Sequence, residues 1–140
     1  MSSADRRDAQ YAALPWRRTD AGEVEVLLIT SRETRRWVIP KGWAKAGEAP
    51  AASTAREALE EAGIEGLVAE AALGVYRYEK RLKSGETQAV EVEVYALEVV
   101  YERKSWPEAR QREKLWTRPQ DAAGLVDEPE LQSLISAFAP

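Results

Sequence analysis

The sequence predicts an α+β protein in which helices cover a mixed β-sheet. Three observations lead to this fold class: strand-like stretches are interleaved with one central helix, two further helices follow near the C-terminus, and 44% of the 140 residues are hydrophobic. A chain of this length can bury a substantial core. Because no internal repeat or composition break divides it, we expect one domain over residues 1–140.

The first part of the chain is predicted to be a flexible lead-in followed by two strands. Residues 1–10, MSSADRRDAQ, are polar and lack the apolar centre of a secretory signal. Residues 23–33 alternate polar and apolar side chains and then become continuously apolar, as a strand entering a core does. Residues 35–40 predict a second, short strand that Pro40 stops, and the glycines and proline of residues 41–50 predict a loop.

A helix is predicted from Pro50 to about Ala62. Proline suits the first helical turn, where its missing N–H is not needed, and Gly63 is a favourable C-terminal stop. At about 100° per residue the small apolar side chains gather on one side. We expect this side to pack against the sheet: Ala52, Ala55, Ala58, Leu59 and Ala62.

The later part of the chain predicts a β-hairpin, one more strand and two helices. Residues 73–81 and 87–102 are β-rich and are joined by a turn at residues 82–86. Residues 112–117 predict a short strand, and residues 118–126 a helix. The last predicted helix, residues 128–138, places four apolar side chains on one face: Leu131, Leu134, Ile135 and Phe138.

Two absences and the net charge limit the possible functions. The chain has no cysteine and no histidine, which excludes disulfides, thiolate metal sites and imidazole catalysis. Any catalysis must therefore use carboxylates, lysine, arginine, hydroxyls and a hard metal ion. The net charge of −4, from 20 basic and 24 acidic residues, argues against a nucleic-acid partner. No apolar run has the length of a membrane span, and we expect a cytoplasmic protein.

The predicted helix carries three glutamates, Glu57, Glu60 and Glu61, on the side opposite its small residues. Each like-charge pair at this spacing costs about 0.2–0.5 kcal/mol, and Arg56 is the cation at the edge of that face. One interpretation is an ordinary solvated helix face. The other is a site for a divalent cation, because a cluster of carboxylate oxygens suits Mg²⁺, with Mn²⁺ as the alternative.

The surrounding pattern decides between these interpretations. Residues 42–64 read GWAKAGEAPAASTAREALEEAGI, which resembles the signature of the Nudix hydrolases. The matching positions are Gly42, Glu48, Arg56, Glu57, Glu60, Glu61, Gly63 and Ile64, while Ala58 is smaller than the usual aliphatic residue. The stretches RRWVIPKGW, LGVYRY and WPEARQREKLW are similar to the diphosphoinositol polyphosphate phosphohydrolase branch of this family.

The resemblance implies the Nudix fold, an α/β/α sandwich, and metal-dependent hydrolysis of a phosphoanhydride. It implies that Glu57, Glu60 and Glu61 bind Mg²⁺, with the carbonyl of Lys41 or Gly42 completing the coordination. Glu57 is the first candidate for the base that activates water, and Glu61 is the second. Arg56 is expected to orient a glutamate through an ion pair. Glu48 is expected to brace the loop, with a metal contact as the alternative.

Substrate binding is expected to come from basic side chains, because phosphate oxygens are recognised by arginine and lysine. Lys41 is the strongest candidate, followed by Arg112, Arg36 and Lys45; each could instead be a solvent-facing charge. Glu91 and Glu93 share one face of the long predicted strand and are either a further ligand or base, or simple alternation on a solvated strand. The valines between them should face the core: Val90, Val92 and Val94.

The sequence leaves several functions open. The branch resemblance implies a diphosphoinositol polyphosphate or a dinucleoside polyphosphate as substrate. Alternatives are nucleoside-diphosphate sugars, nucleoside triphosphates and 5′-RNA pyrophosphates, or a nucleotide-sensing module that does not cleave its ligand. The partner is thus expected to be a polyphosphorylated small molecule, with the protein either a monomer or a homodimer.

Overall fold

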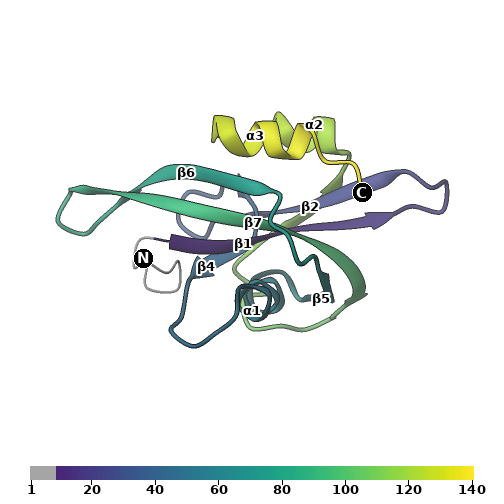
Figure 1. The fold of residues 1–140 in the computed structure, drawn as a ribbon, viewed down its shortest axis with the longest axis horizontal. Helices are drawn as coiled ribbons and strands as arrows, with labels where there is room; N and C mark the ends of the chain where they lie inside the picture. Colours follow the sequence, from purple (N-terminus) through teal and green to yellow (C-terminus); the bar gives the residue numbers. More distant parts are fainter. Residues whose placement is uncertain (1–8) are drawn as a thin grey trace.

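The computed structural model describes residues 9–140 as an eight-stranded mixed sheet with helices on both faces (Figure 1). The strands are β1 (Ala9–Arg18), β2 (Val24–Thr30), β3 (Trp37–Val38), β4 (Lys41–Trp43), β5 (Ile64–Val68), β6 (Gly74–Arg81), β7 (Thr87–Glu102) and β8 (Lys114–Thr117). The helices are α1 (Pro50–Ala62), α2 (Pro119–Ala123) and α3 (Pro129–Ser136).

The sheet is built around the parallel pair of β1 and β7. Its main order is β3-β2-β1-β7-β5, and β4 pairs with β1, β6 with β7, and β8 with β2. β1 and β7 are in register from Ala9 opposite Glu91 to Trp16 opposite Glu98. The other pairings in the described range are antiparallel, so the sheet is mixed, as predicted.

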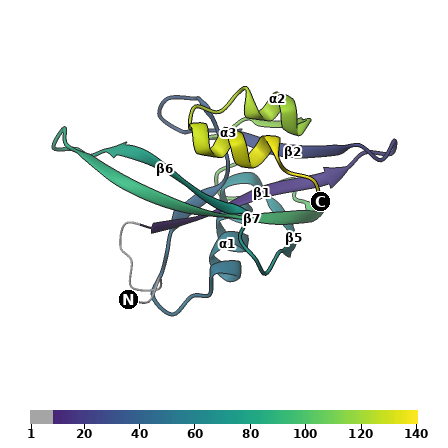
Figure 2. The ribbon, with the colours of Figure 1, turned by 45° about the horizontal axis from the view of Figure 1, so that its top comes forward.

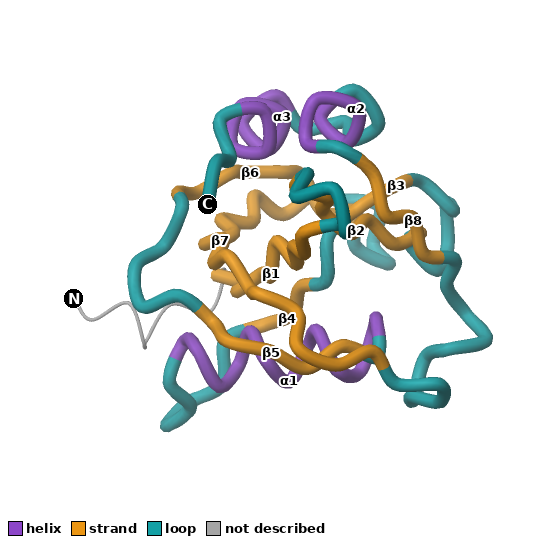
Figure 3. Tube along the Cα trace, turned by 90° about the vertical axis from the view of Figure 1, so that its right-hand side faces the viewer, coloured by secondary structure: helices purple, strands orange, loops and turns teal. Residues whose placement is uncertain are grey.

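Helices cover both faces of the sheet, which confirms the predicted α+β class. Figure 3 shows α2 and α3 on one side of the strands and α1 on the other. The first core lies under α2 and α3 and contains Val90, Val92 and Val94, as expected from the alternation in β7. The second lies under α1 and includes Leu27, Ile29 and Leu97.

The lead-in expected over residues 1–10 falls partly outside the described residues, which begin at Ala9. For Ala9 and Gln10 that expectation was wrong, because both are buried in β1. The strand was missed because its first seven residues, AQYAALP, are buried on both faces of the sheet and so do not alternate. β4 was expected to be loop and β5 was not predicted; both are short and contain glycine, which weakens a strand pattern.

The ends of α1 agree with the prediction, but its buried face does not. Gly63 adopts a left-handed conformation (φ 68°) and donates its N–H to the carbonyls of Ala58 and Leu59, which ends the helix. Ala58 and Ala62 are buried as expected, whereas Ala52 is exposed. The buried set is Ser53, Thr54, Glu57, Ala58, Glu61 and Ala62, so two of the glutamates lie on the packed side of the helix.

The remaining elements follow the sequence closely. β6 and β7 form the predicted hairpin, whose turn extends away from the helices in Figure 2. The turn is closed by the Leu82 N–H, which donates to Glu86 O at 2.8 Å. α2 and α3 are shorter than predicted, but the predicted apolar face of α3 packs on the first core: Leu131, Leu134, Ile135 and Phe138.

Candidate active site

Helix α1 brings the predicted carboxylates to the edge of the sheet, next to β4. Glu57 and Glu61 are each only 8% exposed, although glutamate is rarely buried without a partner. They lie one turn apart, and the side chain of Glu60 is more exposed, at 42%. Each of the two buried carboxylates therefore needs compensating contacts.

Glu57 is held between Arg56 and Gly42. Arg56 Nη1 lies 2.6 Å from Glu57 Oε2, so the expected ion pair is present. The Arg56 guanidinium also donates two hydrogen bonds to Glu48, at 2.9 and 3.0 Å, which lower the pKa of the Glu48 carboxyl to about 2. A side chain on Gly42 would overlap the Glu57 carboxylate, so only glycine allows this approach. This chain of contacts fixes the loop before α1 to the helix.

Glu61 has a different set of partners. Its Oε1 accepts a hydrogen bond from the Lys41 backbone N–H at 3.2 Å, and its Oε2 lies 3.6 Å from Arg112 Nη2. Burial outweighs these contacts and raises the pKa of Glu61 to about 7. Burial likewise lowers the pKa of the neighbouring Lys41 ammonium. The site is thus partly desolvated, and burial destabilises the ionised forms of its side chains unless an opposite charge lies next to them.

The segment after β7 supports the C-terminal end of α1, and sequence reasoning missed this role. The Trp106 indole N–H donates to the carbonyl of Glu61 at 3.2 Å, and the Glu108 N–H donates to the carbonyl of Glu60 at 3.1 Å. The Glu108 carboxylate pairs with Arg112 at 2.7 Å. A side chain on Gly63 would overlap the Trp106 ring. The branch-like stretch WPEARQREKLW was the available signal, but within it only Arg112 was assigned a role, as a candidate for substrate binding.

A polar cleft of about 600 Å³ opens beside Glu61. Its charged lining residues are predominantly basic: Arg32, Arg36, Lys41, Lys80, Arg81 and Arg112, against Glu33 and Glu61. Its aromatic lining residue is Tyr78, which lies under the Lys41 ammonium at 5.2 Å from the ring centroid. The cleft therefore has the chemistry of an anion-binding site next to a carboxylate-bearing helix.

Three of the four predicted substrate residues line this cleft, but two of them are already paired. Arg112 has an 8% exposed side chain and donates to Glu108 and to the carbonyl of Thr30. Arg36 lies 2.8 Å from Glu128. Lys45 does not line the cleft; its carbonyl accepts the Glu48 N–H at 3.1 Å, and its contact with substrate stays a prediction.

Glu91 and Glu93 also lie outside the cleft lining. Glu91 is 3.7 Å from Arg77, and Glu93 accepts a hydrogen bond from the Tyr95 hydroxyl. These contacts agree with the view that the two glutamates are alternating side chains on a half-covered strand. They do not test a catalytic role, and that alternative stays a prediction.

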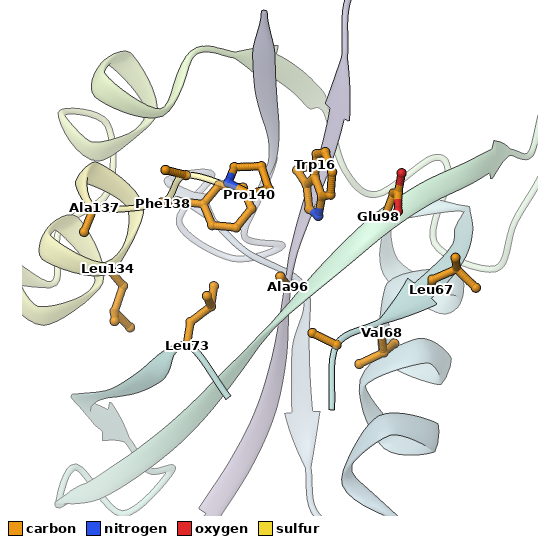
Figure 4. Close-up of a pocket in the computed structure, with 12 residues that line it drawn as sticks. Trp16, Leu67, Val68, Leu73, Ala96, Glu98, Leu134, Ala137, Phe138 and Pro140 are labelled. Atoms are coloured by element: carbon orange, nitrogen blue, oxygen red, sulfur yellow. The ribbon is translucent and has the colours of Figure 1, made fainter. Parts of the chain in front are cut away.

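A second cavity, of about 550 Å³, lies between α3 and the opposite end of the β1–β7 pair. Figure 4 shows Trp16, Phe138 and Pro140 gathered at one side, Leu73 and Leu134 at another, and Leu67 and Val68 of β5 at the far side. Glu98 is the charged member of its lining. None of the predicted catalytic, metal or substrate residues contributes to this cavity.

The family model of the NUDIX domain matches residues 8–137. The chain belongs to the Nudix family. Its Nudix segment is the one that carries Gly42, Glu48 and the arginine and glutamates of α1. The match covers all described elements of the sheet and the helices.

The Nudix relatives cover most of this chain. Nudix hydrolase 13, mitochondrial, from Arabidopsis thaliana is 32% identical over 121 residues, 83% of this chain and 60% of that protein. Nudix hydrolase 12, mitochondrial, from the same plant is 30% identical over 119 residues, 83% of this chain and 59% of that protein. The chain thus spans about 60% of the length of these relatives.

Among solved structures, the Nudix fold is shared with an Ap4A hydrolase of C. elegans in a binary complex. That structure has a TM-score of 0.67 and 24% sequence identity, and the likeness covers 91% of this chain and 92% of that one. At this identity the likeness concerns the fold. The diphosphoinositol branch is not distinguished by these comparisons and stays a prediction.

Nudix hydrolases generally use divalent metal ions such as Mg²⁺. The donor types present here fit such an ion: three carboxylates within two helical turns, with backbone carbonyls of β4 close by. Within residues 9–140, however, no three acidic side chains converge closely enough to form a complete cation site. Glu57 and Glu61 are instead paired with Arg56 and Arg112, so they would have to exchange those contacts for a metal.

The expected cytoplasmic location of this Nudix chain stays a prediction. Both plant relatives are named mitochondrial, so a cytoplasmic location is not supported by them. Among the helices of residues 9–140, none is long and apolar enough to cross a membrane.

Proposed function

We propose that this chain is a Mg²⁺-dependent hydrolase that cleaves a phosphoanhydride bond in a highly phosphorylated small molecule. One observation carries the proposal: Glu61 belongs both to the carboxylate group of α1 and to the lining of the cationic cleft. A polyanion bound in the cleft would therefore lie against the residues that can bring a metal ion and a base to it. The family and the named hydrolase relatives support the same reaction class.

Each residue would have a distinct task. Glu57, Glu60 and Glu61 would hold the ion together with the Gly42 carbonyl, and bound Mg²⁺ would neutralise phosphoryl oxygens and acidify a water molecule. Glu57 is the first candidate to accept the proton of the attacking water, and Glu61 is the second. As the water oxygen bonds to phosphorus, the bridging P–O bond breaks and its electron pair leaves with the departing phosphate.

Positioning residues would support this chemistry. Arg56 keeps Glu57 oriented through the 2.6 Å ion pair, and Glu48 keeps Arg56 in place. Lys41 is the inner cation of the cleft without a salt bridge in the described residues, and it would contact phosphate directly. Arg36 and Arg112 would mainly shape the cleft, because both are held by carboxylates.

The balance of charge in the cleft supports a densely phosphorylated substrate. Six cations and two carboxylates line it, and three of the cations, Lys41, Lys80 and Arg81, have no salt bridge within residues 9–140. A sugar linked to one diphosphate would offer fewer negative charges to these cations. A diphosphoinositol polyphosphate or a dinucleoside polyphosphate fits this balance. The alternatives are a nucleoside-diphosphate-linked sugar or 5′-RNA pyrophosphate, and a non-catalytic Nudix nucleotide sensor.

A substrate panel tests the proposal. Phosphate release with Mg²⁺ and with Mn²⁺ is measured for diphosphoinositol, dinucleoside polyphosphate, nucleotide-sugar and triphosphorylated or capped RNA compounds, with the parent chain and Glu61→Gln. We expect turnover of a polyphosphate by the parent and a loss of about 10²-fold or more in Glu61→Gln. A parent that binds one compound tightly yet releases no phosphate from any of them would instead be a sensor.

A further inference from the structure

Two inner arginines of the cleft differ in their ion pairing from two cations at its outer end. The inner arginines are occupied: Arg112 by Glu108 and Glu61, and Arg36 by Glu128. At the outer end, Lys80 and Arg81 of β6 line the same cleft, and no acidic side chain of residues 9–140 pairs with either one. The protein itself therefore neutralises these two inner arginines, whereas it leaves Lys80 and Arg81 without an acidic partner.

The position of Lys80 follows from the alternation of side chains along β6. Tyr76 is buried, Tyr78 is half-buried beneath Lys41, and Lys80 continues the same face of the strand. Two residues of a strand span about 7 Å. Lys80 thus extends the row of positive charge that begins at Lys41 outward from Glu61. Strand alternation does not place Arg81 on this face; Arg81 lines the cleft from the last position of β6, next to the turn.

The hairpin leaves these two charges available. Lys80 lies opposite Gln88 and Arg81 lies opposite Thr87, so the directly facing residues of β7 are neutral. Opposite charges at such positions would have formed cross-strand pairs and reduced the free charge. Strand pairing continues up to the turn, so the backbone of both residues has a fixed position at the outer end of the cleft.

We propose that Lys80 and Arg81 form a second phosphate-binding subsite, which selects ligands whose additional phosphates extend beyond the reacting pair. This proposal rests on the proposed function, since it assigns the distal part of the same cleft. Unpaired cations can bind phosphate oxygens without breaking an existing ion pair, whereas Arg112 and Arg36 would first have to leave theirs. Arg81 can hold phosphate oxygens bidentately, and Lys80 contributes a compact charge.

Binding without metal tests the subsite separately from catalysis. The full chain is titrated in EDTA with inorganic tripolyphosphate and with pyrophosphate by calorimetry, comparing the parent with the double variant Lys80→Gln/Arg81→Gln. A matched control, Lys83→Gln/Lys104→Gln, removes the same charge from exposed positions that do not line the cleft. All four residues are exposed, so circular dichroism should show an unchanged fold.

We expect the outer-pair variant to bind tripolyphosphate about tenfold more weakly than the parent, a difference of about 1.4 kcal/mol. Pyrophosphate, which can be held at Lys41 alone, should lose less than about threefold, and the control variant should stay within about twofold. An equal loss in the control variant, or no loss of tripolyphosphate binding in the outer-pair variant, overturns the subsite. This experiment measures binding and no turnover. An inactive parent in the substrate panel would contradict the proposed function, but the tripolyphosphate titration would still show whether Lys80 and Arg81 bind phosphate.

Discussion

The cationic cleft and the apolar cavity have nearly the same volume, about 600 and 550 Å³, but the charge and polarity of their linings differ. The cleft is lined by six cations and contains Glu61 of α1. The cavity is lined by small and apolar side chains and has Glu98 at its edge. Both are concave, so shape alone would not say which one binds the substrate.

The origin of the two spaces explains the difference. The cleft forms where loops and strand ends meet: the β2–β3 connection, the outer part of β6 and the segment before β8. Loops at such edges can carry charged side chains, because solvent and ligands reach them. The cavity forms where α3 rests on the sheet, with Trp16 and Phe138 in edge-to-face contact at 6.0 Å. The proposed function assigns the chemistry to the cleft with convergent charge, and on this proposal the apolar cavity belongs to packing.

Exchanging one carboxylate in each region tests this contrast most strongly. Glu57→Gln should reduce phosphate release with Mg²⁺ by about 10²-fold or more, because it removes a proposed metal ligand and the first candidate base. Glu98→Gln makes the same chemical change beside the apolar cavity and should leave the rate within about twofold. Steady-state phosphate release under identical conditions measures both. Comparable losses in the two variants would remove the distinction between the regions.

The second test concerns the buried charge of the cleft in the metal-free protein. Burial raises the pKa of Glu61 from 4.5 to about 7, so the folded state binds this proton more tightly than the unfolded chain does. The resulting stabilisation is fully present below pH 4.5 and is lost as the pH rises through 7. The free energy of unfolding in EDTA should therefore fall by up to about 3 kcal/mol across this range.

Glu61→Gln isolates that contribution, because glutamine has no proton to lose. Urea unfolding of the parent and the variant at pH 5 and pH 8 gives the comparison, and the variant should show a smaller decrease with pH. Mg²⁺ should oppose the decrease in the parent, since a metal ion favours the ionised carboxylate. If the variant loses as much stability as the parent, the cleft does not hold Glu61 in a desolvated state.

The fold could be predicted wherever one side of an element is buried and the other is not. The valines of β7 and the apolar face of α3 repeat with the periods of a strand and a helix, and both lie in the first core as expected. β1 is buried on both faces, and its alanine-rich sequence contains Pro15, so no period was available to identify it. β4 and β5 depend on pairing with distant strands, and local sequence carries little information about such contacts.

For the site, residue identity could be predicted better than residue environment. The spacing of Gly42 and the α1 glutamates led to a region where these residues do lie together. A helical wheel could not show that Glu57 and Glu61 are buried, because their covering comes from β4 and from the segment that carries Trp106 and Arg112. The sequence likewise does not show which arginines and lysines form ion pairs. In the structure Arg112 is paired with Glu108, whereas Lys80 has no acidic partner within residues 9–140.

The smallest expected effect concerns the packing of side chains at the apolar cavity. Leu134 of α3 lines the cavity and lies against Gly74 of β6, so Leu134→Ala removes packing between helix and sheet. Because Leu134 is only half-buried, the loss of unfolding free energy should be about 1–2 kcal/mol, below the range for a fully buried leucine. Phosphate release per folded molecule should not change, since no residue of the cleft touches this space. Urea unfolding and the initial rate, measured on the same preparation, separate the two effects; a large drop in rate at unchanged stability would make the cavity part of the catalytic site.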